Sequence, residues 1–266
     1  MSVILALNAR RSWRRVLALA IGFAIFELIV GLSFSSTDQA LLRELIDQLP
    51  PAVRVLAAGN GADIASPPGY LGSGYFHPVA LTLQAAIVIS LGAGIARDVE
   101  DGVAEMLLSR PLARWRWLSA HATWMAIALA IVSGAGFVGG YSSTFVLDQL
   151  SPVHATDLLL ASLGGYLVFL SVGALALVVA GLVRTGGRVV GWVAGALLVS
   201  YALNYLAQIW ELVRPWGRLS ILHYYDPASI TARGVLPVAT IAVLVSVICI
   251  LTVAAHVLVE RRELAP

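Results

Sequence analysis

The sequence PVALTLQAAIVISLGAGIA, residues 78–96, is followed directly by RDVEDGVAEMLLSRP, residues 97–111. The first stretch is long and apolar enough to cross a membrane, for which about 20 mostly apolar residues suffice. The second stretch is heavily charged. The change from one to the other predicts a membrane-spanning helix that ends in a short hydrophilic segment outside the membrane.

The composition of the whole chain extends this interpretation. Of the 266 residues, 59% are hydrophobic and 12% are charged, whereas soluble proteins carry about 25% charged residues. This difference predicts an integral membrane protein and leaves little sequence for a second, soluble domain. We therefore expect a single all-α membrane domain over residues 1–266. The net charge of +2 gives no reason to expect a nucleic acid as partner.

Six apolar stretches are long enough to span a membrane. They cover residues 16–34, 78–96, 117–141, 158–183, 189–209 and 237–259. With the N-terminus inside, twelve of the 17 basic residues fall in inner segments and five in outer ones. This asymmetry predicts that both termini are cytoplasmic. We expect a multi-pass protein of the cell membrane, and the absence of lysine is typical of a bacterial GC-rich genome.

The segments between the spans contain further local signals. Residues 41–49 alternate apolar and charged faces at helical spacing and predict a helix on the membrane surface, stopped by Pro50-Pro51. Residues 59–74 are rich in Gly, Pro and Ser and predict a loop. The Asp226-Pro227 pair favours a turn before the last span.

At 100° per residue, the charged segment has two different faces. Asp98, Asp101 and Glu105 fall on one face, whereas Val99, Val103, Met106 and Leu107 fall on another. This pattern predicts an amphipathic helix of about three turns, ended by Arg110 and Pro111. Such a helix can dock onto a soluble partner. The alternative is a solvated loop whose arginines only fix the topology. We expect no metal site, because no other ligands accompany the three acids.

The same segment resembles the signature of ABC-2-type exporter permeases. The match consists of Glu100-Asp101-Gly102, Glu105, Leu107-Leu108 and Pro111-Leu112-Ala113-Arg114. Phe76-His77-Pro78 before the second span and Tyr225-Asp226-Pro227 before the last agree with the family, as do six spans with inward termini. In two places the chain departs from the family: Val103 replaces the usual threonine, and His121 stands near a common lysine.

The resemblance implies a coupling helix, within the cytoplasmic loop 97–116, that docks onto a separate ATP-binding subunit. The docking residues implied are Asp98, Glu100, Asp101, Gly102, Glu105, Arg110, Pro111 and Arg114. Residues 1–15 resemble the family's connecting segment along the inner membrane surface, with arginines facing lipid headgroups. A P-loop needs a lysine and this chain has none, so ATP and Mg would be bound by the partner subunit. A second permease copy, or a related permease, is also implied.

Glu27 is the most informative single residue inside a predicted span. A charged group at the centre of a membrane helix costs about 2.5–3.5 kcal/mol on insertion scales. Glu27 is therefore a candidate for the substrate pathway, together with Tyr201 and Asn204 as possible partners; His256 is the weakest candidate. The alternative is a purely structural hydrogen bond between helices.

Two glycine pairs, Gly136/Gly140 and Gly191/Gly195, permit close helix packing, either within the chain or at a dimer seam. No catalytic motif supports an enzyme, and no cofactor is expected in this chain. Two other functions stay open: a proton-coupled secondary carrier centred on Glu27, and a membrane assembly or anchor protein. We see no inverted repeats or broken helices, which are frequent in secondary carriers.

Overall fold

The computed structural model describes residues 2–36, 39–50, 64–108 and 113–261. The described residues form helices and connecting segments and contain no strand. Six of these helices are long and apolar enough to cross a membrane. They are α1 (Ser2–Ser33), α5 (Pro78–Glu100), α7 (Arg114–Thr144), α8 (Ala155–Leu182), α9 (Gly186–Ile209) and α11 (Val238–Arg261). Each contains or overlaps one of the six predicted spans, so the prediction of an all-α protein with six helices that could span a membrane is confirmed for the described residues.

Shorter elements connect the long helices. The α-helical ones are α2 (Gln39–Gln48), α4 (Pro67–Phe76), α6 (Val103–Leu108) and α10 (Pro227–Arg233). The 3-10 turns are η1 (Phe34–Ser36), η2 (Asp148–Leu150), η3 (Arg214–Leu219) and η4 (Ile221–Tyr224). The helix predicted over residues 41–49 is confirmed as α2.

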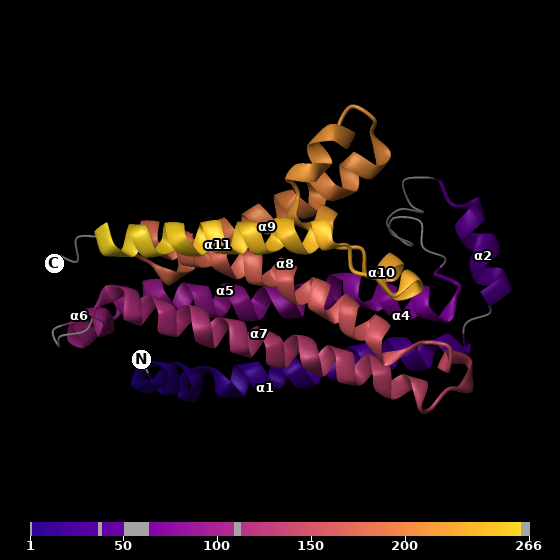
Figure 1. Ribbon diagram of the computed structural model, residues 1–266, viewed down its shortest axis with the longest axis horizontal. Coiled ribbons are helices and arrows are strands. Elements are labelled where there is room, and N and C mark those ends of the chain that lie inside the picture. The colour runs from indigo at the N-terminus through magenta and orange to yellow at the C-terminus, as the bar shows by residue number, and fades with distance from the viewer. Residues whose placement is uncertain (1, 37–38, 51–63, 109–112, 262–266) are drawn as a thin grey trace.

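The long helices form an elongated bundle with two distinct ends (Figure 1). The start of α1, the short helix α6 and the end of α11 lie together at one end, which we call the α6 end. Helices α4 and α10 lie toward the other end, where the Thr231 hydroxyl donates to the Pro68 carbonyl at 2.6 Å. The first and last spans therefore start and finish on the same side. The assignment of that side to the cytoplasm stays a prediction.

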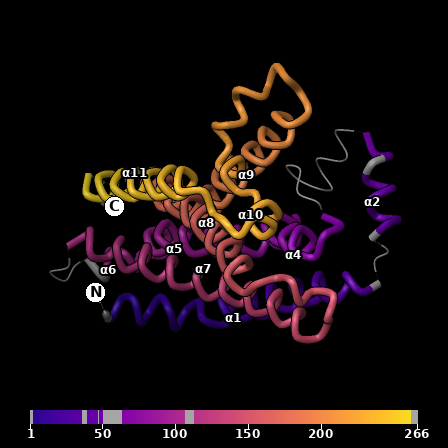
Figure 2. Tube along the Cα trace, turned by 45° about the vertical axis from the view of Figure 1, so that its right-hand side comes forward, coloured from indigo at the N-terminus to yellow at the C-terminus, as the bar shows by residue number. Residues whose placement is uncertain are grey.

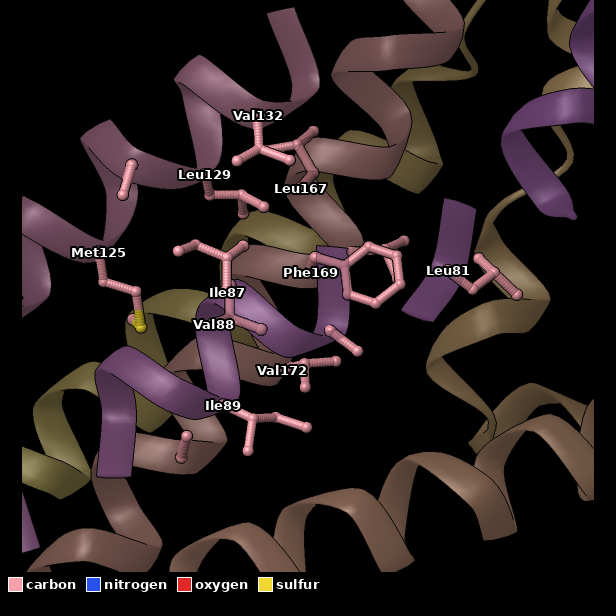
Figure 3. Packing of buried hydrophobic residues seen from close by; sticks show 14 of the residues in the cluster. Leu81, Ile87, Val88, Ile89, Met125, Leu129, Val132, Leu167, Phe169 and Val172 are labelled. Atoms are coloured by element: carbon pink, nitrogen blue, oxygen red, sulfur yellow. The ribbon is translucent and has the colours of Figure 1, made fainter. Parts of the chain in front are cut away.

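The core lies where α5, α7 and α8 meet (Figure 3). Ile87 and Val88 of α5 face Met125 and Leu129 of α7, and Phe169 of α8 lies beside them. All five side chains are buried. Aliphatic and sulfur-containing side chains of this kind fill an interior closely without any polar group to satisfy.

Glycines bring α1 and α7 into close contact. A Cβ atom on Gly139 would overlap the backbone carbonyl of Ala24, and one on Gly136 would lie 2.6 Å from the Phe23 ring. Small residues of this kind let two helix backbones approach in a membrane, where helices associate by close packing. The Gly136/Gly140 pair therefore packs within the chain, as one of the two sequence interpretations expected.

Helices α9 and α11 lie at the periphery of the bundle. In both views α9 leaves the bundle at an angle and ends at the η3 and η4 turns (Figures 1 and 2). The apolar window of α5 or α8 is 61% buried, but only 17% is buried in α9 and 11% in α11. The outer surfaces of these two helices are thus left for lipid or a partner.

Proline placement corrects two predictions. Residues 59–74 were expected to form a loop, yet α4 begins at Pro67 behind the N-cap Ser66, whose side chain accepts from Gly69 N. The Asp226-Pro227 pair does not make a simple turn, because Asp226 caps α10 and accepts from Ser229 N. Proline fits the first helical turn, where its missing N–H has no partner to lose.

The N-terminal segment also differs from expectation. Residues 1–15 were expected to form a separate connecting segment, but from Ser2 onward they belong to α1, which continues unbroken to Ser33. No glycine or proline interrupts the first 20 residues, so nothing in the sequence ends the helix before the span begins.

Candidate functional site

The charged segment after α5 is divided into two parts by Gly102. Helix α5 continues to Glu100, Asp101 follows as its C-cap, and α6 begins only at Val103. Gly102 has a φ of 70°, a left-handed conformation that glycine adopts without steric cost. The predicted single three-turn amphipathic helix is therefore wrong. Its acidic residues are distributed over the end of α5, a turn and a short helix.

Asp98 is buried inside the bundle instead of facing a partner. It is 8% exposed, and its carboxylate lies 3.2 Å from the Arg11 guanidinium of α1 and 3.3 Å from His121 Nε2 of α7. The His121 contact is close enough for an ion pair but is not aligned as a hydrogen bond. Asp98 thus joins three helices at the α6 end and is not available for docking.

Glu100 and Arg114 are also engaged within the chain. The Glu100 carboxylate accepts from the backbone N–H of Gly186 at 3.0 Å, where it satisfies a free donor at the start of α9. The Arg114 guanidinium donates to the Glu260 carbonyl near the end of α11 at 3.2 Å. Both residues therefore fix the ends of other spans beside the turn.

The exposed remainder of the segment is small. Asp101, Glu105 and Met106 are exposed, and the Met106 side chain is 73% accessible. Asp101 and Glu105 are predicted docking residues, whereas Met106 belongs to the apolar face of the predicted helix. Glu100 is exposed as well, but its carboxylate is bonded to Gly186 N. Arg110 and Pro111, which were also predicted to take part, lie outside the described residues.

Glu27 lies in a fully buried site between α1, α4 and α7. It has no exposed surface, and neither carboxylate oxygen has a hydrogen-bond partner among the described residues. A Cβ atom on Gly74 would lie 2.7 Å from its Oε2. Gly140 faces both the Glu27 Cβ and the Tyr75 hydroxyl, and that hydroxyl donates to the Gly136 carbonyl at 3.3 Å. The glycines thus leave the space that Glu27 and Tyr75 occupy.

The predicted partners of Glu27 lie elsewhere. His256 bonds to Ser119 at 3.0 Å and to its own helix. Tyr201 and Asn204 are on α9, where Tyr201 lines a groove against α5 and the buried Asn204 has an unpartnered Oδ1. Helix α9 packs on α5 and α8, whereas Glu27 packs on α4 and α7. The predicted pathway residues Glu27, Tyr201 and Asn204 therefore do not form one site.

Other buried polar groups that sequence reasoning missed lie in the interior. The Ser133 hydroxyl donates to Gln84 Oε1 at 3.3 Å, and the Ser162 hydroxyl donates to the Ser133 carbonyl at 2.9 Å. The Tyr225 hydroxyl donates to the Ala161 carbonyl at 3.2 Å. Gln84 was the signal available in the sequence, because a glutamine within a predicted span usually needs a polar partner inside the bundle. Tyr75 and Tyr225 lie outside the predicted spans, in α4 and directly after η4. Their burial therefore depends on how these short elements pack against the long helices.

The second glycine pair does not pack within the chain. Gly187, Gly191 and Gly195 stand at intervals of four on α9, and a Cβ atom at any of them would meet nothing within 4 Å. The prediction that Gly191 and Gly195 allow close packing is therefore wrong within the described part of the chain. Their alternative role at a dimer seam stays a prediction.

Comparison with known proteins yields no relative: no protein-family model, no curated protein and no solved structure matches the chain. Among the described residues no group of three His, Cys, Asp or Glu side chains is placed to hold a metal ion. The class that the fold defines is an all-helical protein with six apolar helices, consistent with a multi-pass membrane protein.

Proposed function

We propose that the chain is the permease subunit of an ATP-driven exporter of the ABC-2 type. Two copies, or one copy and a related permease, would form the pathway across the membrane. Two separate ATP-binding subunits would bind ATP and Mg and supply the motion.

One observation carries the proposal: the turn between α5 and α6. It presents Asp101, Glu105 and Met106 to solvent, which provides two negative charges and one flexible apolar side chain on a short surface. Its base is fixed to α1 and α7 through Asp98 and to α9 through Glu100. A force applied to the turn would therefore reach three other spans through hydrogen bonds and ion pairs, as coupling to an ATPase requires.

Reversing both exposed charges tests the docking role. Two exposed acids on the turn imply a basic surface on the partner. We therefore expect Asp101→Arg/Glu105→Arg to reduce the ATPase activity that co-purifies with the solubilised protein by about tenfold or more, because the new arginines would face that basic surface. The measurement is ATP hydrolysis by the protein pulled down from its native membrane, normalised to the amount of permease recovered.

The matched control is Glu44→Arg/Asp148→Arg, which makes the same change of charge at two exposed acids in other connecting segments, before α4 and α8. This variant should retain its ATPase partner. Undiminished ATPase activity with the Asp101/Glu105 variant would contradict the proposal.

The buried Glu27 favours a second candidate, a proton-coupled secondary carrier. Ionisable side chains inside a membrane bundle mark proton relays in pumps and transporters, and neither oxygen of Glu27 has a hydrogen-bond partner among the described residues. If the chain works in this way, we expect Glu27→Gln to abolish solute uptake driven by a proton gradient in liposomes that contain only this protein. Uptake that continues in the variant would exclude Glu27 as the coupling group, and no uptake by the wild-type protein would exclude this candidate.

A further inference from the structure

A basic pocket of about 330 Å³ opens at the α6 end, between α1, α5 and α7. Three arginines line it: Arg11 and Arg15 from α1, and Arg97 from α5. The rest of its polar lining consists of two acids, Asp98 and Asp101, and of uncharged side chains that include Asn8, Ser12, Ser90 and His121. The pocket combines fixed positive charges with hydrogen-bond donors, and this combination recognises phosphate.

The charges in the pocket are unevenly balanced. Asp98 is already engaged by Arg11 and His121. Arg15 and Arg97 have no ion-pair partner within the described ranges, and the exposed Asp101 is the other acid in the lining. The amide nitrogen of Asn8, a residue that is 8% exposed, has no acceptor among the described residues either. The pocket therefore presents unsatisfied donors and unpaired positive charge, which an anion would satisfy.

An apolar groove of about 550 Å³ adjoins the pocket along α5, α8 and α9. The two cavities share Ser90 and Arg97 in their linings. Along α5 the groove extends from Pro78 to Arg97, which corresponds to roughly 28 Å of helix. This length is close to the roughly 30 Å thickness of a bilayer's hydrocarbon core. Leu81, Ile89 and Leu198 give it an aliphatic wall.

We propose that the basic pocket and the groove together bind one anionic phospholipid. The phosphate would lie between Arg15 and Arg97 and accept from the Asn8 amide, and one acyl chain would follow the groove between α5 and α9. A basic pocket between membrane helices at the cytoplasmic side is a typical headgroup site. The continuous apolar groove favours a lipid over a soluble phosphate, because a soluble anion would leave the groove without an occupant.

The site adjoins the exposed turn, since Asp101 and Val103 also line the pocket. A bound headgroup would therefore touch the start of α6 as well as α1. The proposal does not rest on the exporter function, and it is tested on the isolated protein.

Charge reversal at Arg15 tests the site. Native mass spectrometry of the detergent-purified protein, titrated with dioleoyl phosphatidylglycerol, measures the affinity for each bound lipid. We expect Arg15→Glu to weaken the tightest binding about tenfold or more. The control is Arg14→Glu, the neighbouring exposed arginine, which lies over the Trp13 ring and outside the pocket. It should retain nearly wild-type affinity.

A second pair of variants tests the groove without changing charge. Ala86 is exposed and lines the groove, so Ala86→Phe should weaken binding of the long-chain lipid but not of a short-chain phosphatidylglycerol. Ala130→Phe, at an exposed position on α7 outside the groove, should change neither affinity.

Three results would overturn the proposal. Equal binding of phosphatidylcholine and phosphatidylglycerol would remove the role of the anion. An equal loss of affinity in Arg14→Glu and Arg15→Glu would indicate general surface charge instead of a pocket. Displacement of the lipid by an equal concentration of inorganic phosphate or glycerol phosphate would assign the pocket to a soluble anion.

Discussion

Replacing Gly139 by valine is expected to prevent the membrane domain from assembling. A Cβ atom at this position would overlap the carbonyl oxygen of Ala24 on α1, and a backbone atom cannot move aside as the end of a side chain can. Helices α1 and α7 would have to separate along their contact. Overpacking inside a close-packed protein costs about 1–3 kcal/mol, and we expect a loss of at least about 3 kcal/mol here because the obstacle is backbone.

The measurement is the fraction of monodisperse protein on size-exclusion chromatography after extraction in mild detergent, together with its melting temperature. Gly134→Val is the matched control, because it makes the same change on the same helix where a Cβ atom would meet nothing within 4 Å. The control should behave like the wild-type protein. Normal yield and melting temperature for Gly139→Val would show that α1 and α7 do not pack as described.

Replacing Glu27 by methionine is expected to raise the melting temperature of the protein. The glutamate is fully buried, and within the described part of the chain neither carboxylate oxygen has a hydrogen-bond partner, so folding removes them from water without compensation. Methionine has a similar length, adapts to irregular spaces and adds no polar atom. We expect a gain on the order of 2 kcal/mol, close to the insertion cost of a charged residue within a membrane helix.

Thermal unfolding in detergent, followed by tryptophan fluorescence, measures this effect. Gln84→Met is the contrasting variant, since Gln84 accepts a hydrogen bond from Ser133. It should not gain the stability expected for Glu27→Met, because methionine removes the unpartnered Gln84 Nε2 but leaves the buried Ser133 hydroxyl without its acceptor. A lower melting temperature for Glu27→Met would show that Glu27 makes a stabilising interaction. A stabilised but inactive protein would identify Glu27 as a group kept for function.

The sequence was sufficient to predict the six spans, since hydropathy and length decide which segments can cross a membrane. It was also sufficient to predict α2 from its periodicity. The N-termini of α4 and α10, at Pro67 and Pro227, were harder to predict. The sequence around them favours a loop and a turn, but proline behind Ser or Asp is equally typical of a helix N-terminus. The local signals were present there, but they have two possible interpretations.

The candidate site was harder to predict, because it depends on which helices pack together. Asp98 was placed on the face that docks a partner, but Arg11 lies 87 residues away in sequence and holds it inside the bundle. Periodicity cannot identify such a long-range partner. Similarly, Glu27 was paired with residues of α9, whereas α1 packs against α4 and α7. The division at Gly102 was also missed, although a signal for it was present, since a glycine within a helical pattern is a recognised helix end.

The uneven burial of the spans has a consequence for the biogenesis of the protein. The chain leaves the ribosome from the N-terminus, and the four helices that pack most closely are completed by residue 182. These four can assemble before the two peripheral helices are synthesised. Helices α9 and α11 then pack onto α5 and α8 while leaving most of their apolar surface uncovered by the described protein, so their retention in the bilayer depends largely on their own apolar side chains. Mutations that add charge to α9 or α11 should therefore act at the insertion machinery, during synthesis, and not on the stability of the finished core.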